Sequence, residues 1–194
     1  MTIYVIRHGQ TNWNAEARLQ GGQDIPLNGL GRSQATANGV ALGRLIGAEV
    51  DRFYFVSSPL GRARETMERV RDAMALDPKA YAIDRRLIEI SFGEWEGLTL
   101  EEVEDRYPGV LADRDADKWH YRPPGERAET YEMLSERVLD WLKSLTGPTV
   151  CVCHGGVMRA LFRAIEGLDE AEASNLPIHQ DRIARISDGR MAWL

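Results

Sequence analysis

Ile3-Tyr4-Val5-Ile6-Arg7-His8-Gly9 is nearly repeated by a second stretch, Val150-Cys151-Val152-Cys153-His154-Gly155-Gly156. Each stretch is a short apolar run that ends in His-Gly, which is typical of a buried strand followed by a turn. Parallel sheets place their working residues at the carboxyl ends of strands. We therefore expect these two strands to bring His8 and His154 together at one edge of a sheet.

Length and composition are those of an ordinary globular protein. The chain has 194 residues, of which 43% are hydrophobic and 28% are charged, which suits one domain with its own core. A formal net charge of -6 disfavours broad binding to nucleic acids or to anionic membranes. No apolar run approaches the roughly 20 residues of a membrane span, and we expect no signal peptide before the first strand. We expect a cytoplasmic monomer or homodimer with neither nucleic acid nor membrane as a partner.

The two cysteines, Cys151 and Cys153, are neighbours on one face of the second histidine-bearing strand. They are too close in sequence for an ordinary disulfide bond, so a reducing compartment is expected. Small buried thiols are the favoured interpretation, and neither cysteine is a favoured nucleophile.

Strands and helices alternate along the rest of the chain. A helix capped by Asn28 is predicted to run to about residue 46, with Leu30, Ala37, Ala41 and Leu45 on its apolar side. Further helices are predicted after Ser58-Pro59, after Thr99, over 131–145 and after His154. Strands are predicted at 2–6, 53–57, 81–83, 150–153, 182–186 and 191–194. This order predicts a layered α/β fold with a mostly parallel sheet.

Cationic side chains lie near the predicted strand ends. Arg7 directly precedes His8, and Arg62 lies in the first turn of the helix predicted to start at Ser58-Pro59. Guanidinium groups bind phosphate in a bidentate way, and the free amides of a helix N-terminus attract anions. Together these residues predict an anion site.

The same site has the residues for phosphoryl transfer. A neutral imidazole, that of His8 or His154, is able to attack phosphorus, and Glu89 is a candidate proton donor for the leaving alkoxide if burial raises its pKa. Each residue taken alone also fits an ordinary structural role, as a satisfied polar group or a surface ion pair. The pattern by itself leaves both interpretations open.

Arg7-His8-Gly9-Gln10-Thr11, together with Asn14, resembles the signature of the histidine phosphatase superfamily, the phosphoglycerate mutase-like proteins. The resemblance continues in order along nearly the whole chain. It includes Pro26–Gly31 with Gln34-Ala35, Ser57–Ala63, Leu87–Glu89 through Gly93–Gly97, and Val152–Gly156. It implies a three-layer αβα sandwich formed by residues 1–194, with a cap-like insertion around 94–125.

The resemblance also implies a role for each site residue. His8 would become phosphohistidine, and Glu89 would act first as proton donor and then as the base that activates water. Arg7, Arg62 and His154 would bind the phosphoryl group. Further phosphate contacts would come from Asn14, Gln20, Gly21, Ser58 and Gly155. The implied substrate is a small-molecule phosphate ester, and neither a metal nor an organic cofactor is expected.

Two activities within the family remain open, a phosphatase and a bisphosphoglycerate-dependent phosphoglycerate mutase. The mutases are usually longer, and a short tail after the last predicted strand leaves less to keep water from the phosphoenzyme. We therefore predict a metal-independent phosphatase, with the mutase as the alternative. Trp119, Tyr121 and Arg122 are candidates for contact with the leaving group, with packing favoured for Trp119, and Arg127 stands where the family commonly has Ser.

Two interpretations outside this pair of activities are weaker. A non-catalytic phosphate- or phosphopeptide-binding module needs neither a nucleophile nor a proton donor, so the presence of both His8 and Glu89 argues against it. A metal hydrolase is disfavoured because the four histidines, His8, His120, His154 and His179, include no i, i+4 ligand pair. The sequence does not define the substrate.

Overall fold

The computed structural model describes all residues from 1 to 194. At its centre is a six-stranded sheet with the order β3-β2-β4-β1-β5-β6. Strands β3, β2, β4 and β1 run parallel, β5 pairs antiparallel with β1, and β6 pairs antiparallel with β5. The strands are β1 (Ile3–Arg7), β2 (Tyr54–Ser57), β3 (Ala82–Ile83), β4 (Thr149–Cys153), β5 (Ile183–Ser187) and β6 (Arg190–Trp193).

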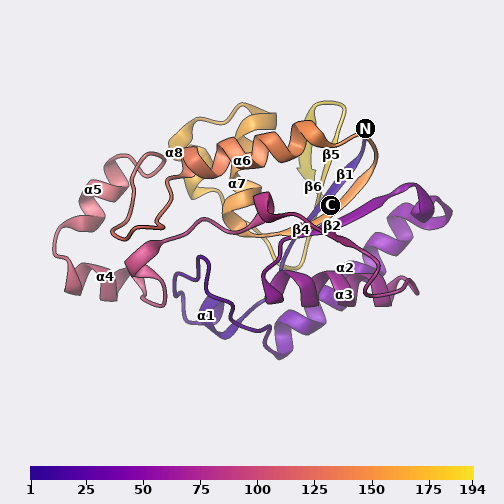
Figure 1. Cartoon of the computed structure of the whole chain (residues 1–194), viewed down its shortest axis with the longest axis horizontal. Coiled ribbons are helices and arrows are strands. Elements are labelled where there is room, and N and C mark those ends of the chain that lie inside the picture. Colours follow the sequence, from indigo (N-terminus) through magenta and orange to yellow (C-terminus); the bar gives the residue numbers. More distant parts are fainter.

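Helices cover both faces of the sheet (Figure 1). Helices α2 (Gly29–Ile46) and α3 (Gly61–Ala73) lie on one face, and α6 (Tyr131–Ser144) and α7 (Gly155–Glu166) lie on the other. Figure 1 shows α4 and α5 at one end of the molecule, away from the sheet. The remaining helices are α1 (Asn12–Ala15), α4 (Leu100–Arg106), α5 (Val110–Ala116), α8 (Glu170–Asn175) and the 3-10 turns Gly47–Arg52, Arg85–Leu87 and Gly93–Trp95. The predicted αβα layering is confirmed.

Alternate side chains of the central strands enter two different cores. In β1, Ile3 and Val5 pack with the α6–α7 layer, whereas Tyr4 and Ile6 pack with the α2–α3 layer. Residues 150–153 of β4 alternate in the same way. A strand that is buried on both faces needs apolar residues at every position. This explains why the two histidine-bearing stretches are continuous apolar runs.

The predicted apolar side of α2 is wrong. Leu30 and Leu45 are 54% and 46% exposed, and the two alanines predicted with them are exposed as well. Helix α3 crosses α2 so closely that a Cβ atom at Gly39 would lie 2.6 Å from the carbonyl oxygen of Val70. Small side chains are needed at such a crossing, and this need outweighs hydrophobicity. The buried face consists of Gly31, Ala35, Asn38, Gly39, Leu42 and Ile46.

The predicted start of the next helix at Ser58-Pro59 is also wrong. Helix α3 begins at Gly61, and its N-cap residue, Leu60, provides no side-chain cap. The carboxylate of Asp24 accepts hydrogen bonds from the Gly61 amide at 2.7 Å and the Arg62 amide at 3.3 Å. The amides predicted to bind an anion are therefore already bound by Asp24.

Other helices begin where their capping residues predict. The Asn28 side chain accepts a hydrogen bond from the Gly31 amide at 2.9 Å, and Thr99 forms a capping box with Glu102 at the start of α4. Helix α8 was not predicted, although Asp169 caps it by accepting from the Glu172 amide.

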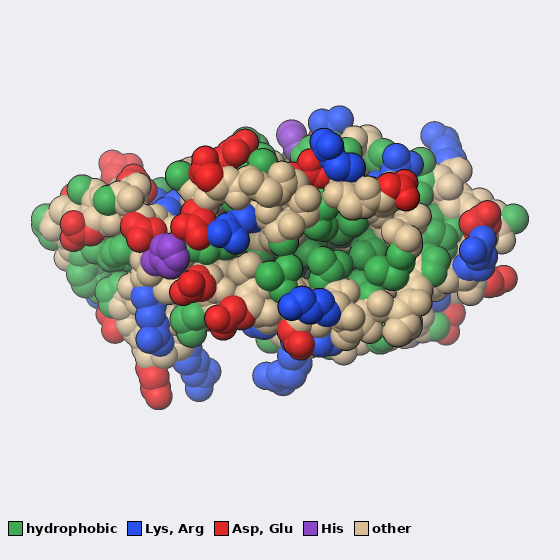
Figure 2. Space-filling view, turned by 90° about the horizontal axis from the view of Figure 1, so that it is seen from above, with side chains coloured by type: hydrophobic (Ala, Val, Ile, Leu, Met, Phe, Trp, Pro, Cys, Tyr) green, Lys and Arg blue, Asp and Glu red, His purple; other side chains and the backbone are tan.

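Figure 2 shows that basic and acidic side chains are interspersed over one face of the molecule, around a hydrophobic hollow. No helix combines the length and the apolar character that crossing a bilayer requires.

Candidate active site

Strand register brings the two histidines together. Arg7 pairs with Cys153 in the parallel β1–β4 ladder, so the residues that follow, His8 and His154, leave the sheet at the same level. The His8 amide continues the ladder by donating to the Cys153 carbonyl at 3.0 Å. The two ring centroids lie 5.1 Å apart, and both side chains are buried.

The His8 ring is fixed in one tautomer. Its Nδ1 lies 2.8 Å from the Gly9 carbonyl oxygen, which only accepts, so Nδ1 carries the hydrogen and Nε2 keeps its lone pair. Nε of Arg62 donates to this Nε2 at 3.3 Å. Burial lowers the pKa of His8 well below its usual value, and the charges of Arg62 and Arg7 lower it further. The ring is therefore neutral at pH 7, as a nucleophilic imidazole must be.

Two guanidinium groups flank the histidines. Arg62 is almost fully buried and donates to the carbonyls of Gly21, at 2.8 Å, and Gln23. Arg7 donates to the Ile178 carbonyl at 2.8 Å, and its Nε has no partner. Burial lowers the pKa of Arg7 to about 10, so the group stays charged at neutral pH. The backbone thus holds both cations in fixed positions beside His8.

His154 connects β4 to α7 and contacts the end of β2. Its Nε2 lies 2.7 Å from the Ser58 hydroxyl, and its buried Nδ1 has no partner. Burial, followed by the charge of Arg62, lowers the pKa of His154 well below its usual value. Ser58 follows β2, which is the other neighbour of β4 in the sheet. Three adjacent strands therefore deliver Ser58, His154 and His8 to one edge.

Glu89 lies in the segment after the Arg85–Leu87 turn, and the start of α7 holds it. The Gly156 amide donates to both carboxylate oxygens, at 3.0 and 3.1 Å, and the Ile90 amide donates to Oε1 at 2.9 Å. A Cβ atom at Gly156 would overlap Glu89 Oε1. The missing side chain of Gly156 is therefore what allows the carboxylate to approach α7.

Asn14 supports the loop after His8. Its Oδ1 accepts from the Thr11 amide at 3.1 Å and from Gln180 Nε2 at 3.0 Å. The same Gln180 nitrogen donates to the His8 carbonyl at 3.1 Å. The structure thus gives Asn14 a part in shaping the loop, and its binding of phosphate stays a prediction.

The other predicted phosphate contacts also border the site. Gln20 is buried, and its Oε1 has no partner. Gly21 has a positive φ of 51° and offers its carbonyl to Arg62. Gly155 begins α7 close to Arg7, since a Cβ atom there would lie 3.7 Å from Arg7 Nε. Their contacts with phosphate stay predictions.

The aromatic residues of the predicted cap divide between two roles. Trp119 is 3% exposed and stacks on Tyr131 at a centroid distance of 5.3 Å, which is a packing role. Tyr121 stacks on Trp95 at 5.5 Å and lines a cavity.

Neither of the two arginines singled out near this region lines this cavity. Arg122 donates to the carbonyls of Ala128, at 2.8 Å, and Glu126, at 3.0 Å, so it stabilises its own loop. Arg127 is exposed and does not line the cavity.

A cavity of about 180 Å³ borders the acid segment, residues 86–91 with Glu89, at Ile90. Aromatic side chains form much of its wall, and the cationic residues Arg114, Lys118 and Arg159 line it together with Glu129. Arg114 is paired with Asp115, and Nζ of Lys118 donates to Asn175 Oδ1 at 2.8 Å. Burial lowers the pKa of Lys118 to about 8, and the two neighbouring arginines add to this effect. Arg114 and Lys118 are four residues apart, but Arg159 lies in α7, so no motif indicated that the three meet.

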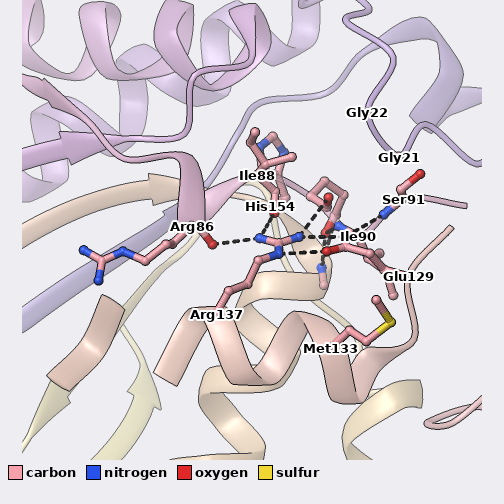
Figure 3. A network of polar contacts seen from close by, with 12 residues as sticks. Gly21, Gly22, Arg86, Ile88, Ile90, Ser91, Glu129, Met133, Arg137 and His154 are labelled. Carbon is pink, nitrogen blue, oxygen red and sulfur yellow. Dashed lines mark hydrogen bonds and ion pairs between the residues drawn. The ribbon is translucent and has the colours of Figure 1, made fainter. Parts of the chain in front are cut away.

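Arg137 and Glu129 also border the site, and no sequence motif includes them. Figure 3 shows Arg137 reaching from α6 to the backbone of the acid segment, with the Glu129 carboxylate beside it. An arginine on an amphipathic helix ordinarily indicates a solvated face, so the sequence carried no signal for this contact.

The remaining candidates do not form a second centre. Cys151 and Cys153 are buried free thiols, and burial raises the pKa of Cys151 well above its usual value. No group of three or more His, Cys, Asp or Glu side chains is arranged to hold a metal ion.

The family model for the histidine phosphatase superfamily (branch 1) matches residues 3–193, so the chain belongs to this superfamily. The chain is 35% identical over 176 residues to glucosyl-3-phosphoglycerate phosphatase of Mycolicibacterium vanbaalenii, covering 86% of this chain and 74% of the relative. It is 32% identical over 202 residues to the probable phosphoglycerate mutase GpmB of Citrobacter koseri, covering 100% and 88%.

Comparison with solved structures also points to the histidine phosphatase family. A mycobacterial glucosyl-3-phosphoglycerate phosphatase in complex with VO3 matches with a TM-score of 0.78 and 28% identity, covering 100% of this chain and 96% of the other. YhfR of Bacillus stearothermophilus matches with a TM-score of 0.77 and 30% identity, covering 99% and 94%. The predicted family is confirmed, and so, at the level of the family, is the predicted enzyme class, a phosphoric monoester hydrolase.

Proposed function

We propose that this chain hydrolyses phosphate monoesters by passing the phosphoryl group to Nε2 of His8 and then to water. The observation that carries the proposal is the state of this nitrogen, which keeps its lone pair because Nδ1–H is bound to the Gly9 carbonyl. Arg62 lies 3.3 Å from the same nitrogen. A phosphoryl group attacked there would come within reach of a buried cation, which stabilises its charge in the transition state.

The proposed reaction has two steps. In the first, a P–N bond to His8 forms as the ester P–O bond breaks, and protonated Glu89 gives its proton to the leaving alkoxide. In the second, ionised Glu89 takes a proton from water, whose oxygen attacks phosphorus. The P–N bond then breaks, inorganic phosphate leaves, and Glu89 is protonated again. Arg7, Arg62 and His154 hold the phosphoryl oxygens throughout.

The leaving group extends into the cavity beside Ile90 under this proposal. Three cations in its wall favour a leaving group with a negative charge of its own. The mycobacterial relatives are named for a phosphoglycerate ester, and a carboxylate of that kind would meet Arg114, Lys118 and Arg159. Residues 94–125, which include α4 and α5, would act as the cap of a single domain. We place the enzyme in the cytoplasm, acting on small phosphate esters.

Phosphoglycerate mutase activity is the second candidate. It is favoured by the GpmB relatives, which align with the whole chain. Interconversion of 2- and 3-phosphoglycerate, stimulated by bisphosphoglycerate and without net phosphate release, would establish it.

The deciding experiment measures phosphate release from a panel of esters with a chelator present, beside the mutase assay. We expect release that survives chelation and falls by at least about 10³-fold in His8→Ala. Acid-labile label should appear on the native enzyme after a quench with radiolabelled substrate. Full activity in His8→Ala would overturn the proposal.

A further inference from the structure

The segment that carries Glu89, residues 86–91, is held from outside by two side chains (Figure 3). One is Arg137 of α6, and the other is Glu129, just before α6. Beyond Leu87 the segment belongs to no helix or strand. Its backbone polar groups must therefore find partners elsewhere in the molecule.

The Arg137 guanidinium binds one side of the segment. Its NH1 donates to the carbonyls of Arg86, at 2.7 Å, and Ile88, at 2.6 Å, and its NH2 donates to the carbonyl of Glu89 at 3.2 Å. A guanidinium presents its donors in a rigid plane. These contacts therefore fix the direction in which the backbone of Glu89 faces.

The Glu129 carboxylate binds the other side. Its two oxygens accept from Nε, at 3.0 Å, and NH2, at 2.9 Å, of Arg137. The Ser91 amide donates to the same carboxylate at 3.1 Å, and the Glu129 amide donates to the Ser91 carbonyl at 3.0 Å. Glu89 thus lies between two fixed points, one on each side of it in the chain.

We propose that Arg137 is a positioning residue for Glu89 and that Glu129 holds Arg137 in place. This inference rests on the proposed function, in which Glu89 exchanges a proton with the leaving group. The Glu89 carboxylate also has to meet the Gly156 amide, so its backbone must be fixed relative to α7. A misplacement of about 1 Å is enough to slow such a step by on the order of 10²-fold.

Two ester substrates distinguish a positioning role of Arg137 from a general role in stability. The nitrophenolate that leaves p-nitrophenyl phosphate needs no proton, whereas the alkoxide that leaves glycerol 3-phosphate does. In Arg137→Met, we expect kcat/KM for glycerol 3-phosphate to fall on the order of 10–100-fold, with little change for p-nitrophenyl phosphate. Glu129→Gln keeps the shape of the pair and should shift the same ratio by less. It also serves as the second variant if Arg137→Met fails to fold.

The matched control is Arg86→Met. It removes a guanidinium from the same segment, but its partners are the carboxylates of Asp84 and Asp140. We expect the ratio of kcat/KM for the two esters to stay at its native value in this variant. Glu89→Gln is the reference for full loss of the proton donor.

The outcomes are distinguishable. An equal loss on both esters in Arg137→Met, or a selective loss in Arg86→Met, would show a general structural role and overturn the inference. A selective loss in Glu89→Gln that is absent from the Arg137 and Glu129 variants would overturn it and leave the proposed function intact. A Glu89→Gln enzyme that hydrolyses both esters like the native one would remove the proton donor from the proposed function, and the positioning role with it.

Discussion

At the scale of single residues, backbone groups set the state of the two groups proposed to do the chemistry. The Gly9 carbonyl selects the tautomer of His8, and the Gly156 amide holds Glu89 beside the start of α7. Both partners are glycine backbones, and at Gly156 the absence of a side chain is itself required. The sequence motifs therefore predict the reacting residues, while their geometry depends on the glycine backbones that hold them.

Gly156→Ala should move Glu89. The added methyl group would overlap Oε1 of Glu89 and lie 3.0 Å from Cδ2 of Leu134. We expect the free energy of unfolding to fall by about 1–3 kcal/mol and kcat/KM on an alkyl phosphate to fall on the order of 10²-fold. Denaturant unfolding and steady-state kinetics would measure the two effects.

Gly155→Ala is the control for that substitution. A methyl group there would meet Arg159 NH1 at 3.5 Å and Arg7 Nε at 3.7 Å, which are ordinary contacts. It should therefore remain close to native in stability. Equal behaviour of the two alanine variants would show that space at residue 156 does not fix Glu89.

At the scale of elements, features set by local sequence could be predicted, and features set by tertiary contacts could not. Apolar runs located the four parallel strands, and the caps at Asn28 and Thr99 located helix starts within a residue. The buried face of α2 and the Asp24 cap of α3 could not be predicted, because both depend on residues distant in sequence. The site divides in the same way. Motif residues were predicted, whereas the contacts of Arg137 arise only from the packing of α6.

Alanine substitutions at two glycines of α2 should have opposite effects on stability. At Gly39, a Cβ atom would lie 2.6 Å from the Val70 carbonyl oxygen and 2.8 Å from Ala73 Cβ. Gly39→Ala should therefore destabilise by about 1–3 kcal/mol, although alanine has the higher helix propensity. At Gly43, the nearest atom is Met74 Cγ at 3.6 Å, so Gly43→Ala should stabilise by about 0.5–1 kcal/mol.

Thermal unfolding of both variants would test the interpretation of this crossing. A stabilising effect at residue 39 would mean that the two helices are able to separate at little cost. The correction to the apolar side of α2 would then need another cause.

At the scale of the whole molecule, charge is distributed unevenly. The chain carries a net charge of -6, yet Arg7 and Arg62 flank the histidines, and Arg114, Lys118 and Arg159 line the adjoining cavity. Only the fold brings together cations from β1, α3, α5 and α7, so this concentration is a property of the tertiary structure. It makes the site attractive to a small dianionic or trianionic ester within an otherwise acidic protein.

Lys118 should make substrate preference depend on pH. Burial lowers its pKa to about 8, so the side chain is charged below that pH and neutral above it. A carboxylate on the leaving group would be favoured only while Lys118 is charged. We therefore expect the ratio of kcat/KM for 3-phosphoglycerate to that for glycerol 3-phosphate to be high near pH 7 and to fall as the pH rises through about 8.

The two esters differ only in that 3-phosphoglycerate has a carboxylate where glycerol 3-phosphate has a hydroxymethyl group. The ionisation of the phosphates and of the catalytic residues therefore changes both values of kcat/KM equally and cancels in their ratio. Because kcat/KM reports the free enzyme, the midpoint of the fall should match the pKa of Lys118. Lys118→Met should give a lower ratio that no longer changes between pH 7 and 9, with hydrolysis of p-nitrophenyl phosphate nearly unaffected. A ratio that keeps its pH dependence in Lys118→Met would show that another group recognises the carboxylate, and the leaving group would then lie elsewhere than in this cavity.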